Sequence, residues 1–192
     1  DKLHEFCNTV ALFFHNWTSY RMGNVVFCGR ELSPDDNAPW QDLPLSQGDY
    51  NVVVLHGDVD SDAYGHIDGR MLSTAPVNYV ALGHRHALQT LSFGRHKGAY
   101  SGTLEARGFD ETAPTGFVVV DTDKDEITFV KQALRRVVTR QIDLSKADSD
   151  IAAERTIADA VADESPRNYL NVVLVGTVNR GVRAEYVAKQ YL

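Results

Sequence analysis

The sequence predicts an α/β protein, and two kinds of segment support that fold class. Residues 51–55 and 78–82 are short, fully apolar runs, which is typical of strands buried on both faces of a sheet. Residues 148–164 instead repeat apolar side chains at helical spacing, and a strand-like run follows at 170–175. The chain therefore combines buried strands with at least one amphipathic helix.

The elements predicted ahead of residue 100 are short. Strands rich in β-branched and aromatic residues are expected at 10–14, 24–28, 51–55 and 78–82. Residues 33–48 contain three prolines and are predicted to be a loop. Residues 65–75 are predicted to be a loop that leads into a short helix.

Further strands are predicted in the middle of the chain. Residues 99–103 favour a short strand or a bend. The runs 116–121 and 126–131 flank the turn sequence 122–125 and predict a β-hairpin. Residues 137–142 are expected to form the next strand.

The character of the sequence changes near residue 143. A linker at 143–146 precedes the helix predicted at 148–164, which should end at a Ser-Pro pair. One helix and one strand are too little to form a core of their own. The predicted organisation is therefore a first domain of residues 1–142 and the start of a second module at 143–192.

Bulk composition restricts the class of protein. The length of 192 residues fits one domain, or one domain and part of another. No segment approaches the ~20 apolar residues of a membrane span, and no export leader is visible. Two cysteines, Cys7 and Cys28, do not make a disulfide framework. A reduced, cytoplasmic setting is the simplest expectation.

Charge is distributed unevenly along the chain. The net charge of −7 argues against a protein that binds nucleic acid over its whole surface. Residues 84–108, however, carry four basic side chains against one acidic, and residues 131–140 carry four basic side chains and no acid. This local excess is compatible with a phosphate-bearing substrate. A solvated surface of mixed charge is the alternative explanation.

Histidines follow the two buried strands. His56 ends the first run, and the sequence Gly83-His84-Arg85-His86 follows the second. On an extended backbone, residues at i and i+2 point to the same side, and imidazole is a common metal ligand. We therefore predict a metal centre at the end of the sheet. The alternative is that each histidine is a hydrogen-bonded structural residue.

The remaining histidines lack this context and are expected to be surface or structural residues: His4, His15, His66 and His96. Three imidazoles suit Mn²⁺, Fe²⁺ or Zn²⁺. A catalytic pair of metals also needs carboxylates, and no acid follows a comparable strand. If the centre holds two metals, its acidic ligands should precede residue 1.

Five segments in order resemble the calcineurin-like metallophosphoesterases, and above all the bacterial DNA-repair exonucleases of the SbcD type. The segments are NVVVLHG (51–57), NYVALGHRH (78–86), AYSGT (99–103), GFDE (108–111) and GFVVV (116–120). The resemblance implies part of a four-layer αββα sandwich, which would be the C-terminal half of the nuclease domain. Residues 143–192 would then begin an α/β cap domain.

The resemblance also implies a mechanism and its ligands. It assigns His56 and His84 to one divalent metal and His86 to a second, with Mn²⁺ as the expected ion. Metal-activated water would hydrolyse a phosphodiester bond of DNA. Expected partners are DNA, an SMC-like ATPase and a second copy of the chain, with no membrane.

The chain departs from the family at its beginning. The first three family motifs are absent, although Asp1 could be the last residue of a Gly-Asn-His-Asp motif. The catalytic residues are therefore expected upstream of residue 1, and this chain alone is expected to be inactive. It would be a fragment or a split half. The family's usual Pro-Gly-Ser reads Ser101-Gly102-Thr103, which retains a hydroxyl.

Substrate contacts are predicted among the loop cations. Arg95, Lys97 and Arg107 follow the histidines and are the candidates for phosphate binding. Arg85 is expected to point away from the metal ligands on an extended strand, and to make at most a surface salt bridge.

Two alternatives remain open on the sequence alone. The acidic net charge also suits a phosphoesterase that acts on a small phosphodiester or phosphomonoester. In an alternative of another class, the chain is a non-catalytic binding or assembly module with vestigial histidines.

Overall fold

The structure is a computed structural model that describes residues 13–32, 42–61 and 65–189. It is a mixed α/β structure of several small sheets and few helices, which confirms the predicted fold class at that level. Strands 116–121 and 126–131 occur as predicted.

Contacts within the chain define two compact units. The first takes residues 1–104 and 113–132, and the second takes residues 105–112 and 133–192. The sequence places its domain boundary after residue 142, whereas this division assigns the strand β11 (Val137–Asp143) to the second unit. The reason is that β11 pairs with a later strand of that unit.

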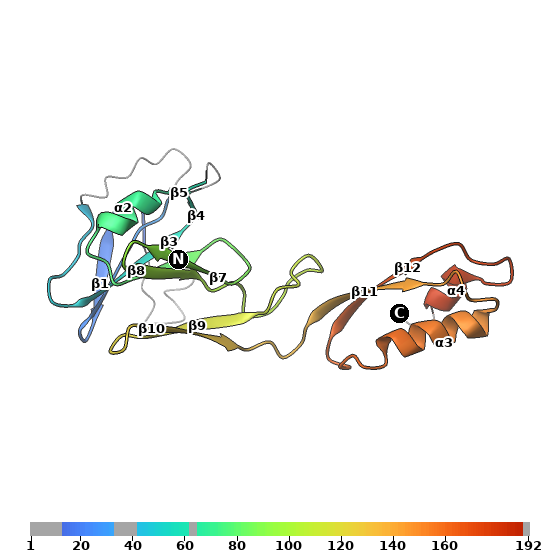
Figure 1. The fold of residues 1–192 in the computed structure, drawn as a ribbon. Coiled ribbons are helices and arrows are strands. Elements are labelled where there is room, and N and C mark those ends of the chain that lie inside the picture. Colours follow the sequence, from blue (N-terminus) through green and yellow to red (C-terminus); the bar gives the residue numbers. More distant parts are fainter. Residues whose placement is uncertain (1–12, 33–41, 62–64, 190–192) are drawn as a thin grey trace. The chain divides into compact units, whose positions relative to one another are not determined.

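A six-stranded sheet forms the frame of the first unit (Figure 1). Its strands are β1 (Thr18–Met22), β2 (Val25–Gly29), β3 (Tyr50–His56), β6 (Tyr79–Gly83), β7 (Gln89–Phe93) and β8 (His96–Tyr100). They lie in the order β1-β2-β3-β6-β8-β7. The central strands β2, β3, β6 and β8 are parallel, whereas β1 and β7 pair antiparallel at the edges. All four central strands therefore end at the same edge of the sheet.

Most strands of this sheet were predictable. The predictions at 24–28, 51–55 and 78–82 are confirmed to within one residue. Strand β8 begins and ends three residues earlier than the segment predicted at 99–103. Strands β1 and β7 were not predicted, because their sequences TSYRM and QTLSF are mainly polar or exposed. The strand predicted at 10–14 lies mostly outside the described residues.

One face of the sheet packs against the helix α2 (Gly69–Thr74). Leu72 of α2 joins Val53, Val80 and Tyr100 of the sheet in a single buried cluster. The side chain of Asp68 caps the helix by accepting hydrogen bonds from two backbone N–H groups of its first turn. The short helix predicted within 65–75 is therefore confirmed.

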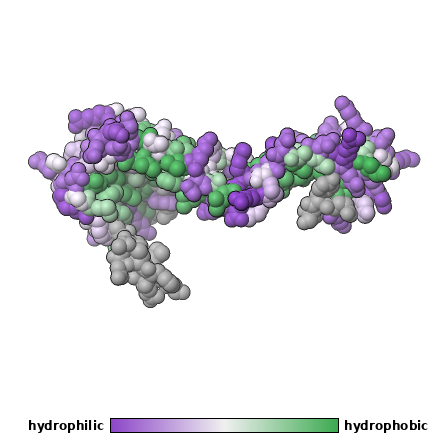
Figure 2. Space-filling view, turned by 90° about the horizontal axis from the view of Figure 1, so that it is seen from below, coloured by the Kyte–Doolittle hydropathy of each residue, from purple (hydrophilic) through white to green (hydrophobic). Residues whose placement is uncertain are grey.

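The opposite face is covered by the hairpin of β9 (Gly116–Asp121) and β10 (Glu126–Lys131). Val118 and Ile127 of the hairpin pack against a cluster that contains Val52 and Tyr79. The outer face of the same hairpin exposes apolar side chains that include Phe117. Figure 2, which views the molecule from below, shows hydrophobic residues gathered on this side of the first unit.

The second unit contains a parallel pair of strands and two helices. Strand β11 pairs with β12 (Tyr169–Val175), and the helices are α3 (Asp150–Val161) and α4 (Ala184–Lys189). Apolar residues of both helices and both strands form its core, among them Ile142, Ile157 and Val187. The predicted helix 148–164 and strand 170–175 are confirmed, whereas α4 was not predicted.

Candidate metal centre

Two of the predicted ligands meet at the carboxyl edge of the sheet. His56 is the last residue of β3, and His84 follows directly after β6. These strands pair in parallel register, with His56 opposite Gly83. The centroids of the His56 and His84 rings lie 5.5 Å apart, and the ring planes meet at 75°.

This separation suits two imidazoles that bind one ion. With metal–nitrogen bonds of about 2 Å at a tetrahedral angle, two imidazole centroids lie ~5 Å apart. His56 is exposed and His84 is half-buried, so both rings are accessible from one side at least. The two side chains therefore fit the nitrogen part of a metal site.

Gly83 makes room for the His56 ring. A Cβ atom at position 83 would lie 2.8 Å from Nδ1 of His56, which is closer than real contacts of this kind. Because residues 56 and 83 are directly opposite in register, any larger side chain would displace the imidazole. The glycine ahead of the His-x-His sequence thus has a steric function in this fold.

The backbone at His84 departs from a strand. Its φ is +111°, a value that side chains other than glycine rarely adopt and that costs on the order of 1–3 kcal/mol. Strand β6 ends at Gly83. The expectation that His84, Arg85 and His86 lie on one extended segment is therefore wrong. With this backbone conformation at His84, its ring lies beside that of His56.

The third predicted ligand is not brought into the same group. His86 is exposed and lies outside any strand, and its carbonyl accepts a hydrogen bond from the Thr103 backbone N–H at 3.3 Å. Among the described residues, no three side chains of His, Cys, Asp or Glu are grouped so that they could hold an ion. The structure thus supplies the pair His56 and His84.

Side-chain contacts of Arg85 hold the segments that follow His56 and His84 in the chain. Nε of Arg85 donates to Oδ1 of Asp58 at 2.7 Å, and Nη1 donates to the side-chain oxygen of Gln89 at 2.7 Å. The guanidinium also lies over the Tyr100 ring, 5.3 Å from its centroid. Asp58 raises the pKa of Arg85 further above its ordinary value. The predicted salt bridge of Arg85 is confirmed, whereas its partners were not predictable.

Tyr100 holds the backbone segment that follows His56. Its side chain is fully buried, and its hydroxyl donates to the Gly57 carbonyl at 2.9 Å. The hydroxyl also accepts a hydrogen bond from the Val59 backbone N–H at 3.1 Å. The segment that follows His56 is therefore fixed to strand β8.

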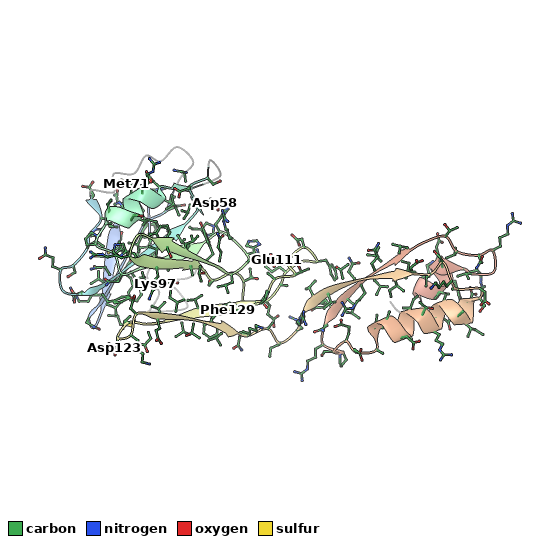
Figure 3. The ribbon with its side chains drawn as sticks, viewed as in Figure 1. Asp58, Met71, Lys97, Glu111, Asp123 and Phe129 are labelled. Atoms are coloured by element: carbon green, nitrogen blue, oxygen red, sulfur yellow. The ribbon has the colours of Figure 1, made fainter. Side chains whose placement is uncertain are left out.

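Two of the predicted phosphate contacts lie at the other end of the sheet. Lys97 is opposite Tyr79, the first residue of β6, and Arg95 precedes β8. Lys97 forms an ion pair with Asp125 at 2.9 Å. Figure 3 shows Lys97 apart from Asp58, which lies just beyond His56 in the chain. Arg95 and Lys97 follow His84 and His86 in the sequence, but they do not lie near the candidate centre.

Arg107, the third predicted phosphate contact, belongs to the second unit. Its Nη2 lies 3.4 Å from a carboxylate oxygen of Glu111, which is labelled in Figure 3. The Arg107 backbone N–H also donates to the Glu111 carboxylate, at 2.8 Å. The side chain thus has a local partner four residues along the chain.

The other histidines have separate settings. Nδ1 of His66 lies 2.6 Å from the Ser61 carbonyl oxygen, and His15 lies near Glu31. His96 is buried at the start of β8, and burial lowers the pKa of its imidazole. His4 lies outside the described residues. The prediction that His15, His66 and His96 are surface or structural residues agrees with these positions.

A cavity of about 860 Å³ has none of His56, His84 and His86 in its lining. Its lining includes Asn51 near the start of β3, Asn78 just ahead of β6, and Arg95 just ahead of β8. These positions mark the amino ends of parallel strands. The cavity is therefore at the edge of the sheet opposite the candidate centre.

Thr103 carries an unsatisfied hydroxyl close to the His86 segment. Its Oγ1 is the one buried side-chain nitrogen or oxygen without a hydrogen-bond partner in the described ranges. Its backbone, in contrast, bonds to His86 on one side and to Gly116 on the other. A buried hydroxyl without a partner lowers the free energy of unfolding, because it has lost its hydrogen bonds to water and gained none in the protein.

Replacing this hydroxyl should stabilise the protein. We expect Thr103→Val to raise the free energy of unfolding by about 1 kcal/mol, because it removes the unpaired oxygen and keeps the shape. Urea denaturation measures the change. Thr103→Ser retains the hydroxyl and loses a methyl group, and it should lower stability. A loss of stability in the valine variant would mean that a water molecule satisfies the hydroxyl.

Comparisons with known proteins do not assign the chain to a family. No protein-family model matches it, and a search of curated proteins finds no match. Within the part of the chain that the structure describes, no helix is both long and apolar enough to cross a membrane.

Proposed function

We propose that this chain is part of a metal-dependent phosphoesterase of the calcineurin-like type, and that the enzyme is a DNA exonuclease of the SbcD type. One observation carries the proposal: adjacent parallel strands deliver His56 and His84 to one edge of the sheet with ring centroids 5.5 Å apart. Ligands commonly bind at the carboxyl ends of parallel strands. The choice of family rests on the ordered motifs between residues 51 and 120, which resemble those of the calcineurin-like enzymes.

The layers of the first unit are compatible with this fold. The hairpin β9–β10 packs on one face of the six-stranded sheet, and α2 packs on the other. We propose that these are layers of the αββα sandwich of the family. Residues 143–192, which contain α3, β12 and α4, would belong to the α/β cap domain, and β12 pairs in parallel with β11, the strand just ahead of them.

His56 and His84 would hold one divalent metal through ring nitrogens, and His86 would serve a second metal. Mn²⁺ is the proposed ion. When bound, such ions activate water and stabilise charge on a phosphoryl group. Gly83 leaves the space that the His56 ring occupies, and the His84 ring lies next to it. DNA is the proposed substrate, and an SMC-like ATPase and a second copy of the chain are the proposed partners.

Metal binding by the chain itself tests the proposal. Titration with Zn²⁺ or Mn²⁺, followed by calorimetry, should show one weakly bound ion. His56→Ala and His84→Ala should each weaken binding at least tenfold, because each removes one of two ligands. His66→Ala is the matched control and should leave binding unchanged, because His66 contacts the Ser61 carbonyl instead.

Two results would count against this function. Binding of Zn²⁺ that is equally strong in His84→Ala and in the unchanged chain would exclude the candidate centre. Absence of any bound ion in the unchanged chain would favour a non-catalytic binding module.

The acidic net charge of −7 favours a second candidate, a phosphoesterase that acts on a small phosphate ester. Affinity for linear duplex DNA distinguishes the two. A DNA enzyme should lose affinity steeply as salt rises, because basic side chains release counterions from the phosphates. A small-ester enzyme should show little affinity for DNA at any salt concentration.

A further inference from the structure

Two short segments carry the histidines of the candidate centre, and side chains join these segments directly. Asp58 lies two residues after His56, and Arg85 lies one residue after His84. Their ion pair, with 2.7 Å between Nε and Oδ1, therefore connects the two exits of β3 and β6. The Asp58 side chain is only 14% exposed, so the pair is partly shielded from solvent.

Tyr100 adds a rigid support beneath this ion pair. Its buried ring lies under the Arg85 guanidinium, and its hydroxyl bonds to the backbone at Gly57 and Val59, on either side of Asp58. The same tyrosine thus supports both partners of the ion pair. Gln89 holds a further guanidinium nitrogen of Arg85.

The ring of His84 needs such support. The backbone there has a φ of +111°, which persists in a protein only where surrounding contacts impose it. On one side of His84, the Gly83 carbonyl accepts a hydrogen bond from the Gly57 N–H at 3.2 Å. On the other side, the side-chain contacts of Arg85 hold the residue that follows. Strand β6 ends at Gly83, so strand pairing does not hold the segment after His84.

We infer that Arg85, Asp58 and Tyr100 form a positioning network that fixes the distance between the His56 and His84 rings. None of the three is a proposed ligand. The inference rests on the proposed function for its biological meaning, since the rings matter as metal ligands. The network itself can be tested in the metal-free chain.

Nuclear magnetic resonance of the imidazole protons gives a readout that needs no metal. In the unchanged chain, rings whose centroids lie 5.5 Å apart should show a nuclear Overhauser effect between His56 and His84. Arg85→Met removes the charge and keeps a long apolar side chain, and it should abolish this effect. Asp58→Asn should weaken it. Arg85→Lys retains the charge and should partly restore it.

The ion pair of Arg21 with Asp49 provides a matched control. It also has a nitrogen–oxygen distance of 2.7 Å, and Asp49 lies just ahead of the start of β3, away from the histidines. Arg21→Met should leave the effect between the rings intact. Zn²⁺ affinity should fall about tenfold in Arg85→Met and remain unchanged in Arg21→Met, as expected for residues that orient metal ligands.

The outcomes separate this inference from the proposed function. An unchanged effect between the rings in Arg85→Met would overturn the positioning network, whatever the metal affinity. Loss of the effect in Arg21→Met as well would also overturn it, because any loosening of the unit would then suffice. Failure of the unchanged chain to bind Zn²⁺ would contradict the function, while the ring measurement would still decide the network.

Discussion

Gly57→Ala is expected to destabilise the first unit by about 3 kcal/mol or more, the largest effect that we predict for a single substitution. A Cβ atom at position 57 would lie 2.0 Å from the carbonyl oxygen of Gly65. Gly57 is buried, and its N–H donates to the Gly83 carbonyl at 3.2 Å. The backbone cannot move away from Gly65 without weakening this link between β3 and β6.

The loss can be measured by urea denaturation followed through tryptophan fluorescence, since Trp17 packs against the core of this unit. Gly48→Ala is the matched control. Gly48 has a φ of +82° but no atom within 4 Å of an added Cβ. It should therefore lose only about 1 kcal/mol of backbone strain energy. Equal losses of stability in the two variants would contradict the close approach of Gly57 to the Gly65 carbonyl.

Tyr100→Phe is expected to lower the free energy of unfolding by about 2–4 kcal/mol. The substitution keeps the buried ring and removes only the hydroxyl. The Gly57 carbonyl and the Val59 N–H would then lose their partner in a region with little access to water. An unpaired buried polar group costs more than the net gain from one hydrogen bond, which makes the expected loss large for one oxygen atom.

Tyr79→Phe makes the same chemical change on the neighbouring strand. Tyr79 is also buried, but within the described residues the structure shows no hydrogen bond of its hydroxyl. Its substitution should change stability by less than about 0.5 kcal/mol. Similar losses at positions 79 and 100 would contradict the anchoring function of Tyr100. Denaturation of both variants under identical conditions provides the comparison.

The parts of the fold that sequence predicted share a simple physical basis. The hairpin at 116–131 and the strands near 51–55 and 78–82 have strong local patterns, because each buries apolar side chains of its own. Strand β1 has mostly exposed side chains, so no hydrophobic pattern marks it. It exists because its backbone pairs with β2.

The candidate site divides in the same way. His56 and His84 were predictable, because each follows an apolar strand and parallel strands end at one edge. The distance between their rings was not predictable. The backbone at His84 has a positive φ, and no sequence pattern indicates it. Arg95 and Lys97 show that order in the sequence does not decide which residues lie at the same edge of a sheet. They follow the histidines in sequence, yet the chain returns along the antiparallel strand β7, so Arg95 and Lys97 lie at the amino end of the sheet, where β8 begins.

By itself, the sequence determined the α/β class, the buried strands, the hairpin and the two histidines at strand exits, because each depends on neighbouring residues in the chain. Only the tertiary structure decided which groups surround those histidines. The ion pair of Arg85 with Asp58 joins positions 27 residues apart, and the Tyr100 hydroxyl reaches Gly57 across 43 residues. Contacts over such separations arise from strand order and register, which place distant residues side by side and leave no periodic trace in the sequence.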